Sequence, residues 1–391
     1  MRPCPPFERR SEHWQRGRRR WSVAVLGAGV LLFACRPAPP TPSSGAGAGG
    51  DPGPTRSEAA GTIGTDSRTA ERGFIALVGT SMSDPLWPVY HATARRYATR
   101  TTDLSIRTAA PQIRSPNAQS KLVHRLLEAG MRGLCIEPVD DRHLAPLLDS
   151  VAAAGIVVVT LRRRTAAREE LLHVGADPQD VGVMLAEIAV QAAGAGAGAR
   201  RTVPGGPRPG TVPAGSDATP AIGTIGITHA GSVDGLSRKR HDAMNRHLKR
   251  HPRVVTVLDL DCHADSDEAR VQIRDGLERY PRTNAWVVVG TWPLIDLPHD
   301  ERLLRLGCRL VTVDALPDQW PRIASGELVA SVALDYEKMV TEALRLCLTA
   351  CRGDILRADT YFVAPERITA ENLDQWQQRW TRWSSPVEAA P

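Results

Sequence analysis

Regular alternation between short apolar runs and longer segments of helical period constrains what the chain beyond Gly73 can fold into. The first apolar run is Phe74–Val78, and a helix is expected around Trp87 to Arg100. The nearly all-apolar run Ile156–Val159 is typical of a strand in a parallel sheet covered on both faces. Strand–helix units of this length favour doubly wound parallel sheets, and there are too many for one compact sheet. The sequence therefore predicts an α/β fold with two Rossmann-like lobes.

Further strands and helix ends follow from the same pattern. Ser115 is expected to cap a helix that stops at Gly130, and Asp141 is expected to cap the next one. Later strands are expected at Leu104–Ile106, Leu134–Ile136, Ile222–Thr228, Val254–Leu258, Trp286–Val289, Leu310–Val313 and Leu328–Val332.

The N-terminus has the layout of a secretory signal. An Arg-rich stretch ends at Arg20, and the uncharged run that follows to Ala34 is too short for a bilayer, which takes ~20 apolar residues. Leu32-Phe33-Ala34-Cys35 resembles the lipobox of bacterial lipoproteins, in which the thiol takes a diacylglyceryl group. The resemblance implies a signal peptide over residues 1–34, lipidation of Cys35, and an exported, membrane-anchored protein. The alternative is an ordinary signal peptide with an incidental cysteine.

The predicted signal peptide also explains the net charge of the chain, which is +6. Residues 1–34 hold seven arginines and two glutamates, so the remainder is nearly neutral. The basic excess is a targeting device, and no nucleic-acid partner follows from it.

Two segments have the composition of chain without secondary structure. Residues 35–72 are rich in Pro, Gly, Ser, Thr and Ala, which predicts a flexible tether. Residues 192–220 begin with an Ala-Gly run and predict a disordered insertion after a helix over Val181–Gln191. Loops from helix to strand lie opposite the strand carboxyl ends, so the insertion is expected far from any ligand site.

From Gly73 onward the chain resembles the type I periplasmic sugar-binding proteins of the ribose and galactose class. Each motif is weak alone, but their order along residues 73–380 is specific. The stretches that carry the resemblance are Ile75–Val78, Ser83–Trp87, Gly133–Asp140, Ala154–Leu161, His173–Asp177, Val311–Asp314 and Ile368–Asp374.

The resemblance implies two lobes joined by a three-strand hinge, with the ligand held in the cleft between them. The N-terminal lobe would comprise residues 73–176 and 335–362. The C-terminal lobe would comprise residues 177–334 and 363–391. Closure of the lobes around ligand would be a hinge motion.

A sugar cleft needs groups that bind hydroxyls and an aromatic ring for the apolar face of the sugar. The family pattern implies that Asp84, Arg163, Arg238 and Asp314 bind ligand polar groups and that Trp87 stacks on it. Glu137 and Thr291, which follow strands, complete the expected set.

The chain departs from the family pattern at several places. Leu86 stands in place of one aromatic residue, Arg162 in place of an Asp, Leu334 in place of a Gln, and Gly290-Thr291-Trp292 in place of Asn-Asp. These changes predict a more cationic pocket and leave an acidic or phosphorylated sugar open as ligand. The alternative for Arg162 and Arg164 is a solvated charge run.

Other residue patterns are weaker indications of a functional site. His247 and His251 have metal-ligand spacing on a helix, but Pro252 disfavours helix there. The aspartates 259, 261, 265 and 267 lack the glycine of an EF-hand loop, and Asp265 suits a helix N-cap. Trp376, Trp380 and Trp383 are expected to form the packing face of the last helix. No metal site and no cofactor are predicted.

The chain shows no catalytic motif, so an enzyme is not expected. The sequence predicts a lipid-anchored solute-binding protein that captures a small polar, sugar-like ligand for an ABC permease. Alternatives are a sensor that presents ligand to a membrane receptor or kinase, and a transcription-regulator-like effector-binding protein. The last lacks support, because a signal and tether stand where a helix-turn-helix would be needed.

Overall fold

The structure is a computed structural model, and it describes residues 73–101, 104–167, 171–198, 223–298, 301, 303–304, 307–354, 356 and 358–385. The predicted signal peptide, the lipidation site Cys35, the tether and residues 199–220 of the predicted insertion lie outside the described residues.

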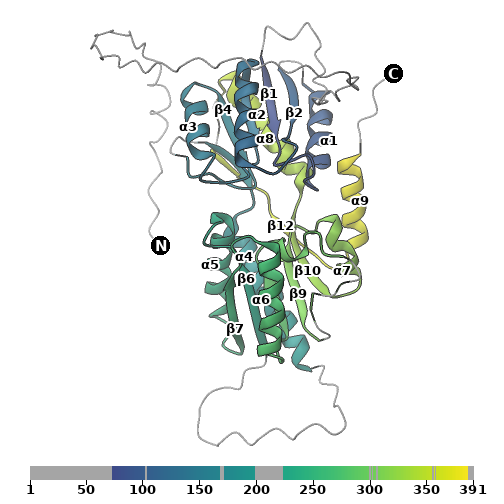
Figure 1. Ribbon diagram of the computed structural model, residues 1–391. Coiled ribbons are helices and arrows are strands. Elements are labelled where there is room, and N and C mark those ends of the chain that lie inside the picture. Colours follow the sequence, from purple (N-terminus) through teal and green to yellow (C-terminus); the bar gives the residue numbers. More distant parts are fainter. Residues whose placement is uncertain are drawn as a thin grey trace, which may run out of the picture. The chain divides into compact units, whose positions relative to one another are not determined.

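Six strands form the first sheet, in the order β11-β5-β4-β3-β1-β2 (Figure 1). All of its paired strands are parallel. The strands are β1 (Phe74–Val78), β2 (Ser105–Ala109), β3 (Met131–Ile136), β4 (Val157–Leu161), β5 (Leu172–Gly175) and β11 (Thr360–Phe362).

The second sheet also has six strands, in the order β12-β10-β9-β8-β6-β7. They are β6 (Gly223–His229), β7 (Val254–Asp261), β8 (Ala285–Val288), β9 (Arg309–Val313), β10 (Leu328–Leu334) and β12 (Pro365–Ile368). Two α/β lobes with doubly wound sheets are therefore confirmed. One edge differs from a purely parallel sheet, because β12 pairs antiparallel with β10. The chain enters β12 directly from β11. Strand β12 therefore runs away from the hinge, whereas the other strands of this sheet run toward the hinge.

Nine α-helices and two short 3-10 helices occur within the described residues. They are α1 (Trp87–Ala98), α2 (Pro116–Glu128), α3 (Ala145–Ala153), α4 (Pro178–Gly198), α5 (Gly235–Leu248), α6 (Ser266–Arg279), η1 (Trp292–Leu294), η2 (Pro317–Gln319), α7 (Trp320–Ala324), α8 (Tyr336–Arg352) and α9 (Leu373–Ser384). No helix in the described part of the chain is long and apolar enough to cross a membrane.

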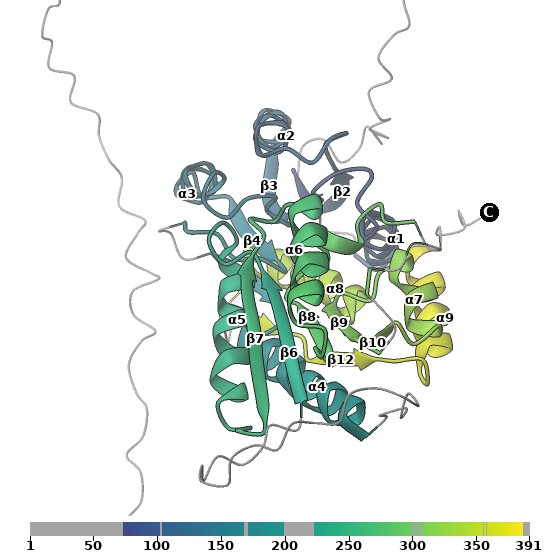
Figure 2. The same ribbon diagram turned by 60° about the horizontal axis from the view of Figure 1, so that its bottom comes forward.

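The helices cover both sheets on both faces. Helix α8 lies along one face of the first sheet, while α2 and α3 lie on the other (Figure 1). Helix α4 crosses one face of the second sheet and α6 lies on the opposite one, while α5 runs beside β6 and β7 at the sheet edge (Figure 2). The chain passes between the lobes three times, after β5, after β10 and after β11.

Two helix boundaries differ from the sequence prediction. Helix α3 begins at Ala145 and not after Asp141, because the Asp140 carboxylate accepts hydrogen bonds from the backbone N–H groups of residues 142 and 143 and holds a turn there. Helix α4 continues to Gly198, beyond the expected end at Gln191. The Ala-rich run continues the helix because alanine has the highest helix propensity, and Ala193 packs on β6 at Gly223.

An aromatic cluster joins α9 to the hinge. Trp376, Trp380 and Trp383 are buried, which confirms the expected packing face of the last helix. Their rings contact Tyr336, the first residue of α8, edge-on with centroids 5.9–6.5 Å away. The guanidinium of Arg96 on α1 donates to the Trp383 carbonyl at 2.9 Å. Helix α9 therefore packs against the residue that ends the second crossing between the lobes.

Candidate functional site

A cleft of about 630 Å³ lies between the lobes, at the carboxyl ends of β1, β3 and β4 on one side and β6, β8 and β9 on the other. Ligands of open α/β sheets bind outside these strand ends. The charged side chains that line the cleft are Arg114, Arg162, Arg163, Arg240, Asp84, Glu137, Asp140, Asp234, Asp296, Asp314 and Asp318.

Five of the residues singled out from the sequence meet in this cleft: Asp84, Glu137, Arg163, Thr291 and Asp314. Each follows directly or closely after a strand, and the carboxyl ends of parallel strands converge at one edge of a sheet. The other two, Trp87 and Arg238, do not line it.

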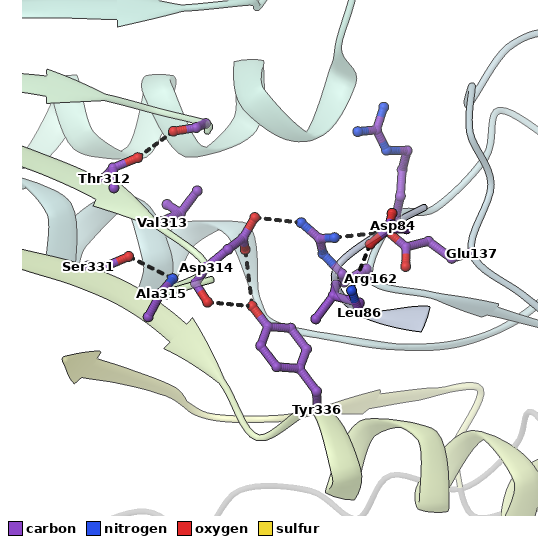
Figure 3. A network of polar contacts seen from close by, with 12 residues as sticks. Asp84, Leu86, Glu137, Arg162, Thr312, Val313, Asp314, Ala315, Ser331 and Tyr336 are labelled. Carbon is purple, nitrogen blue, oxygen red and sulfur yellow. Dashed lines mark hydrogen bonds and ion pairs between the residues drawn. The ribbon is translucent and has the colours of Figure 1, made fainter. Parts of the chain in front are cut away.

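Arg162 occupies the centre of the cleft (Figure 3). One Nη donates to Glu137 in the same lobe at 2.9 Å, and the other donates to Asp314 in the opposite lobe at 2.7 Å. Its side chain is only 17% exposed, so it is not part of a solvated charge run. Both Arg162 and Asp314 have left-handed backbone conformations, with φ of 58° and 81°. Backbone strain of this kind persists where the surrounding structure holds it, which is common at ligand sites.

Glu137 is buried at the end of β3, against the first lobe. The hydroxyl of Tyr90 on α1 donates to its second oxygen at 2.7 Å. Burial raises the pKa of Glu137, and this effect outweighs the attraction of Arg162. The ion pair with Arg162 and the bond from Tyr90 are therefore what keep a carboxylate in this position.

Asp314 is positioned by a residue next to the hinge, Tyr336. The Tyr336 hydroxyl lies 3.1 Å from its backbone oxygen and 3.3 Å from Oδ1, while Oδ2 accepts from Arg162 (Figure 3). Tyr336 is fully buried, and burial together with the Asp314 charge raises its pKa well above the ordinary value. The tyrosine therefore remains a neutral donor, and it links the cleft to the hinge helix α8.

A second ion pair crosses the cleft. Arg163 donates to Asp234 of the opposite lobe at 3.0 Å. Asp234 also caps α5, because its other oxygen accepts from the backbone N–H groups of Leu236 at 2.8 Å and Ser237 at 3.2 Å. The lobes are thus held together by two arginine–carboxylate pairs that involve consecutive residues of one loop.

Arg240 is the arginine that α5 presents to the cleft, and it corrects the expectation for Arg238. Ser237, Arg240 and Met244 are buried at helical spacing, whereas Arg238 is exposed. The Nε of Arg240 is buried without a hydrogen-bond partner, and no described residue forms an ion pair with its guanidinium. Burial lowers its pKa, although Asp314 and Asp234 act in the opposite direction.

The aromatic residue of the cleft also differs from the expected one. Trp87 is buried in the core, under Gly79, where a Cβ would lie 2.6 Å from the indole. Trp292 of η1 lines the cleft instead, folded over Gly290 so closely that a Cβ there would lie 2.3 Å from its ring. The Gly-Thr-Trp departure from the family pattern therefore provides an aromatic surface, with Thr291 beside it.

Asp84 serves mainly its own loop. Its Oδ1 accepts from the backbone N–H of Leu86 at 2.9 Å, and its Oδ2 accepts from the hydroxyl of Thr80. Arg114 lies 3.5 Å from the same carboxylate and is half exposed.

The charges of the cleft do not make it cationic, contrary to the sequence expectation. Seven carboxylates and four arginines line it. The groups at its centre balance, with Arg162, Arg163 and Arg240 against Glu137, Asp234 and Asp314. The arginine gained at position 162 is neutralised by carboxylates from both lobes, which the sequence could not show because Glu137 and Asp314 lie far from it along the chain.

The two lobes, the three crossings and the polar cleft define the type I periplasmic binding protein class. The sequence profile described as "Periplasmic binding protein domain" matches residues 75–355, and the chain belongs to this family of solute-binding proteins. No curated protein sequence matches the chain significantly.

Solved structures share the fold at low identity. An ABC transporter solute-binding protein from Actinobacillus succinogenes with bound D-allose is 14% identical with a TM-score of 0.61, over 78% of this chain and 99% of that one. The Caulobacter myo-inositol binding protein is 18% identical, with a TM-score of 0.59, over 78% and 95% of the two chains. A solute-binding protein from Agrobacterium vitis with bound D-fucose is 15% identical, with a TM-score of 0.62, over 78% and 98%.

Proposed function

We propose that this protein captures a small, neutral, polyhydroxylated solute of the sugar or cyclitol type between its lobes and delivers it to an ABC importer. The observation that carries the proposal is the convergence of guanidinium and carboxylate groups from both lobes on one cleft of about 630 Å³. Its size lies within the ~300–1,000 Å³ of small-molecule sites. The allose, inositol and fucose bound by three proteins of the same fold support the ligand class.

The chemistry of the cleft suits hydroxyl groups. A hydroxyl both donates and accepts, so it pairs with arginine forks and with carboxylate oxygens. Arg240 offers a buried Nε that has no hydrogen-bond partner among the described residues, and Trp292 offers an apolar ring face. The balanced central charges favour a neutral solute over an acidic or phosphorylated sugar. The three central arginines are already matched by three carboxylates, so an anionic ligand would give the site a net negative charge.

Binding is coupled to lobe motion by the two ion pairs across the cleft. Arg162–Asp314 and Arg163–Asp234 join the lobes at 2.7 and 3.0 Å. Solute entry requires these pairs to separate, and the same side chains can then bind solute hydroxyls. A ligand drives closure only by binding the closed state more tightly than the open one.

A thermal-shift screen followed by calorimetry tests the ligand class. Neutral sugars and cyclitols are compared with the matching sugar acids and sugar phosphates, and the neutral set is expected to raise the melting temperature. Stabilisation by the anionic set alone would contradict the proposal.

Two arginines on one helix provide a matched pair for the site. Arg240→Gln is expected to weaken binding of the identified solute about 10- to 100-fold, since a hydrogen bond from a charged group contributes about 1.5–3 kcal/mol. The exposed Arg238→Gln is expected to stay within twofold of wild type. Equal affinities for the two variants would remove Arg240 from the site.

We further propose that Cys35 carries a lipid and that residues 35–72 tether the lobes to a membrane. The lipobox-like Leu32–Cys35 supports this. Metabolic labelling with a fatty-acid probe is expected to mark the wild type and Cys262→Ala but not Cys35→Ala. Equal labelling of all three would contradict lipidation at Cys35.

A further inference from the structure

Three side chains meet at one edge of the second lobe, outside the cleft. His229 ends β6, His241 lies on α5 and Asp259 lies on β7. Figure 2 shows these three elements side by side. The residues are up to 30 positions apart in the chain, so no local spacing in the sequence indicates the cluster. It is separate from the cleft residues that carry the proposed function.

The geometry is that of a preformed set of ligands. One potential ligand atom from each residue lies within 4.8 Å of the other two. The His241 Nε2 is 2.8 Å from an Asp259 oxygen, and the His229 Nε2 is 3.6 Å from the same oxygen. The two imidazole rings stack with centroids 4.0 Å apart. The histidines are mostly buried, while the Asp259 side chain is 34% exposed and leaves a path from solvent.

We propose that His229, His241 and Asp259 bind a divalent transition-metal ion of the zinc type. Two imidazole nitrogens and one carboxylate oxygen form a donor set that suits Zn²⁺ and not Ca²⁺ or Mg²⁺, which take oxygen ligands. A water molecule would complete four-fold coordination. The ion would replace the hydrogen bond between His241 and Asp259 by metal–ligand bonds to one centre, and so join α5 and β6 to the edge strand β7.

The Nδ1 of His229 accepts the backbone N–H of Gly231 at 2.9 Å, and an Asp261 oxygen lies 3.5 Å from the same nitrogen. A ring that binds metal through Nε2 carries its proton on Nδ1 and donates it to a carboxylate or carbonyl. Metal binding at Nε2 would therefore break the bond from Gly231 and turn Nδ1 into a donor toward Asp261, which is on the same strand as Asp259. Asp261 is itself positioned, because it accepts from the backbone N–H groups of Ser232 at 2.8 Å and His263 at 2.9 Å.

Another stacked histidine pair provides the control. His247 and His251 have centroids 5.2 Å apart, but within the described residues no third histidine, cysteine or carboxylate completes a set with them. A site that depends on three converging groups should lose affinity when His241 changes and not when His247 changes. General attraction of zinc to histidines would give the two variants similar affinities.

Calorimetry of the chelator-treated full chain with zinc chloride tests the proposal. We expect one ion per chain, and an affinity at least about tenfold weaker in His241→Gln and in Asp259→Asn, with His247→Gln unchanged. Circular dichroism without metal tests whether each variant is folded. If His241→Gln does not fold, Asp259→Asn remains as the variant that tests the site. Visible absorption of bound cobalt(II) provides an independent readout of four-coordinate binding. Absence of zinc binding, or equal binding by wild type and both site variants, would overturn the proposal.

Discussion

Replacing Arg162 by methionine should destabilise the protein more than any change on the cleft rim. The substitution removes the guanidinium between Glu137 and Asp314, whose side chains are 6% and 7% exposed. Two carboxylates would remain in a buried position without their partner. Breaking a buried ion pair in this way typically costs about 3–5 kcal/mol. Arg164→Met, two residues away and exposed, should change stability by under about 0.5 kcal/mol.

The loss should depend on pH in a definite direction. Burial already raises the pKa of Glu137, and removal of the Arg162 charge raises it further. At pH values between the pKa of Glu137 in the unfolded chain and its higher pKa in the folded variant, the folded state binds one more proton than the unfolded state. The stability of the Arg162→Met variant therefore falls as the pH rises through this window. Its deficit relative to wild type should be smallest near pH 5 and largest above neutrality.

Urea denaturation followed by circular dichroism between pH 5 and pH 8 measures both effects. The double variant Arg162→Met with Glu137→Gln should recover part of the loss at neutral pH, because one unpaired acid becomes a neutral amide. A deficit below about 1 kcal/mol in Arg162→Met, with no dependence on pH, would refute the account of Arg162 as the partner of buried carboxylates.

Two further predictions concern groups outside the cleft centre. The imidazole of His173 is buried in β5, and burial together with Arg164 lowers its pKa to about 3. Its NMR shifts should stay constant between pH 5 and pH 8, and it should reduce stability as the pH falls below 6.5, where only the unfolded chain gains the proton; a midpoint near 6.5 would contradict this environment. The Asp265 carboxylate accepts from the backbone N–H of Glu268 at 2.8 Å and caps α6. Asp265→Ala should cost about 1 kcal/mol in urea denaturation and the exposed Asp267→Ala clearly less, and equal losses would show that capping is not the cause.

The fold and part of the cleft could be predicted from the sequence because their signals are local. Apolar runs such as Phe74–Val78 can be recognised in isolation, and a residue that follows a parallel strand must lie at the cleft edge of the sheet. This reasoning placed Glu137, Thr291 and Asp314 correctly in the cleft. The capping role of Asp265 is local in the same sense, since the residues it bonds are its immediate neighbours.

The tertiary structure decided what depends on rotation of an element about its axis. Arg238 and Arg240 are equivalent in the sequence of α5, and only the packing of the helix on its sheet turns Arg240 inward. The same holds for Trp87, which β1 and α1 bury, while Trp292 lines the cleft.

The tertiary structure also decided which charged side chains come into contact. Arg162 finds one partner 25 residues away and another 152 residues away. His229, His241 and Asp259 come together only because β6, α5 and β7 are neighbours at one sheet edge. Interaction energies between charged groups depend on distance in space and on burial, and neither quantity is encoded in the order of residues along the chain.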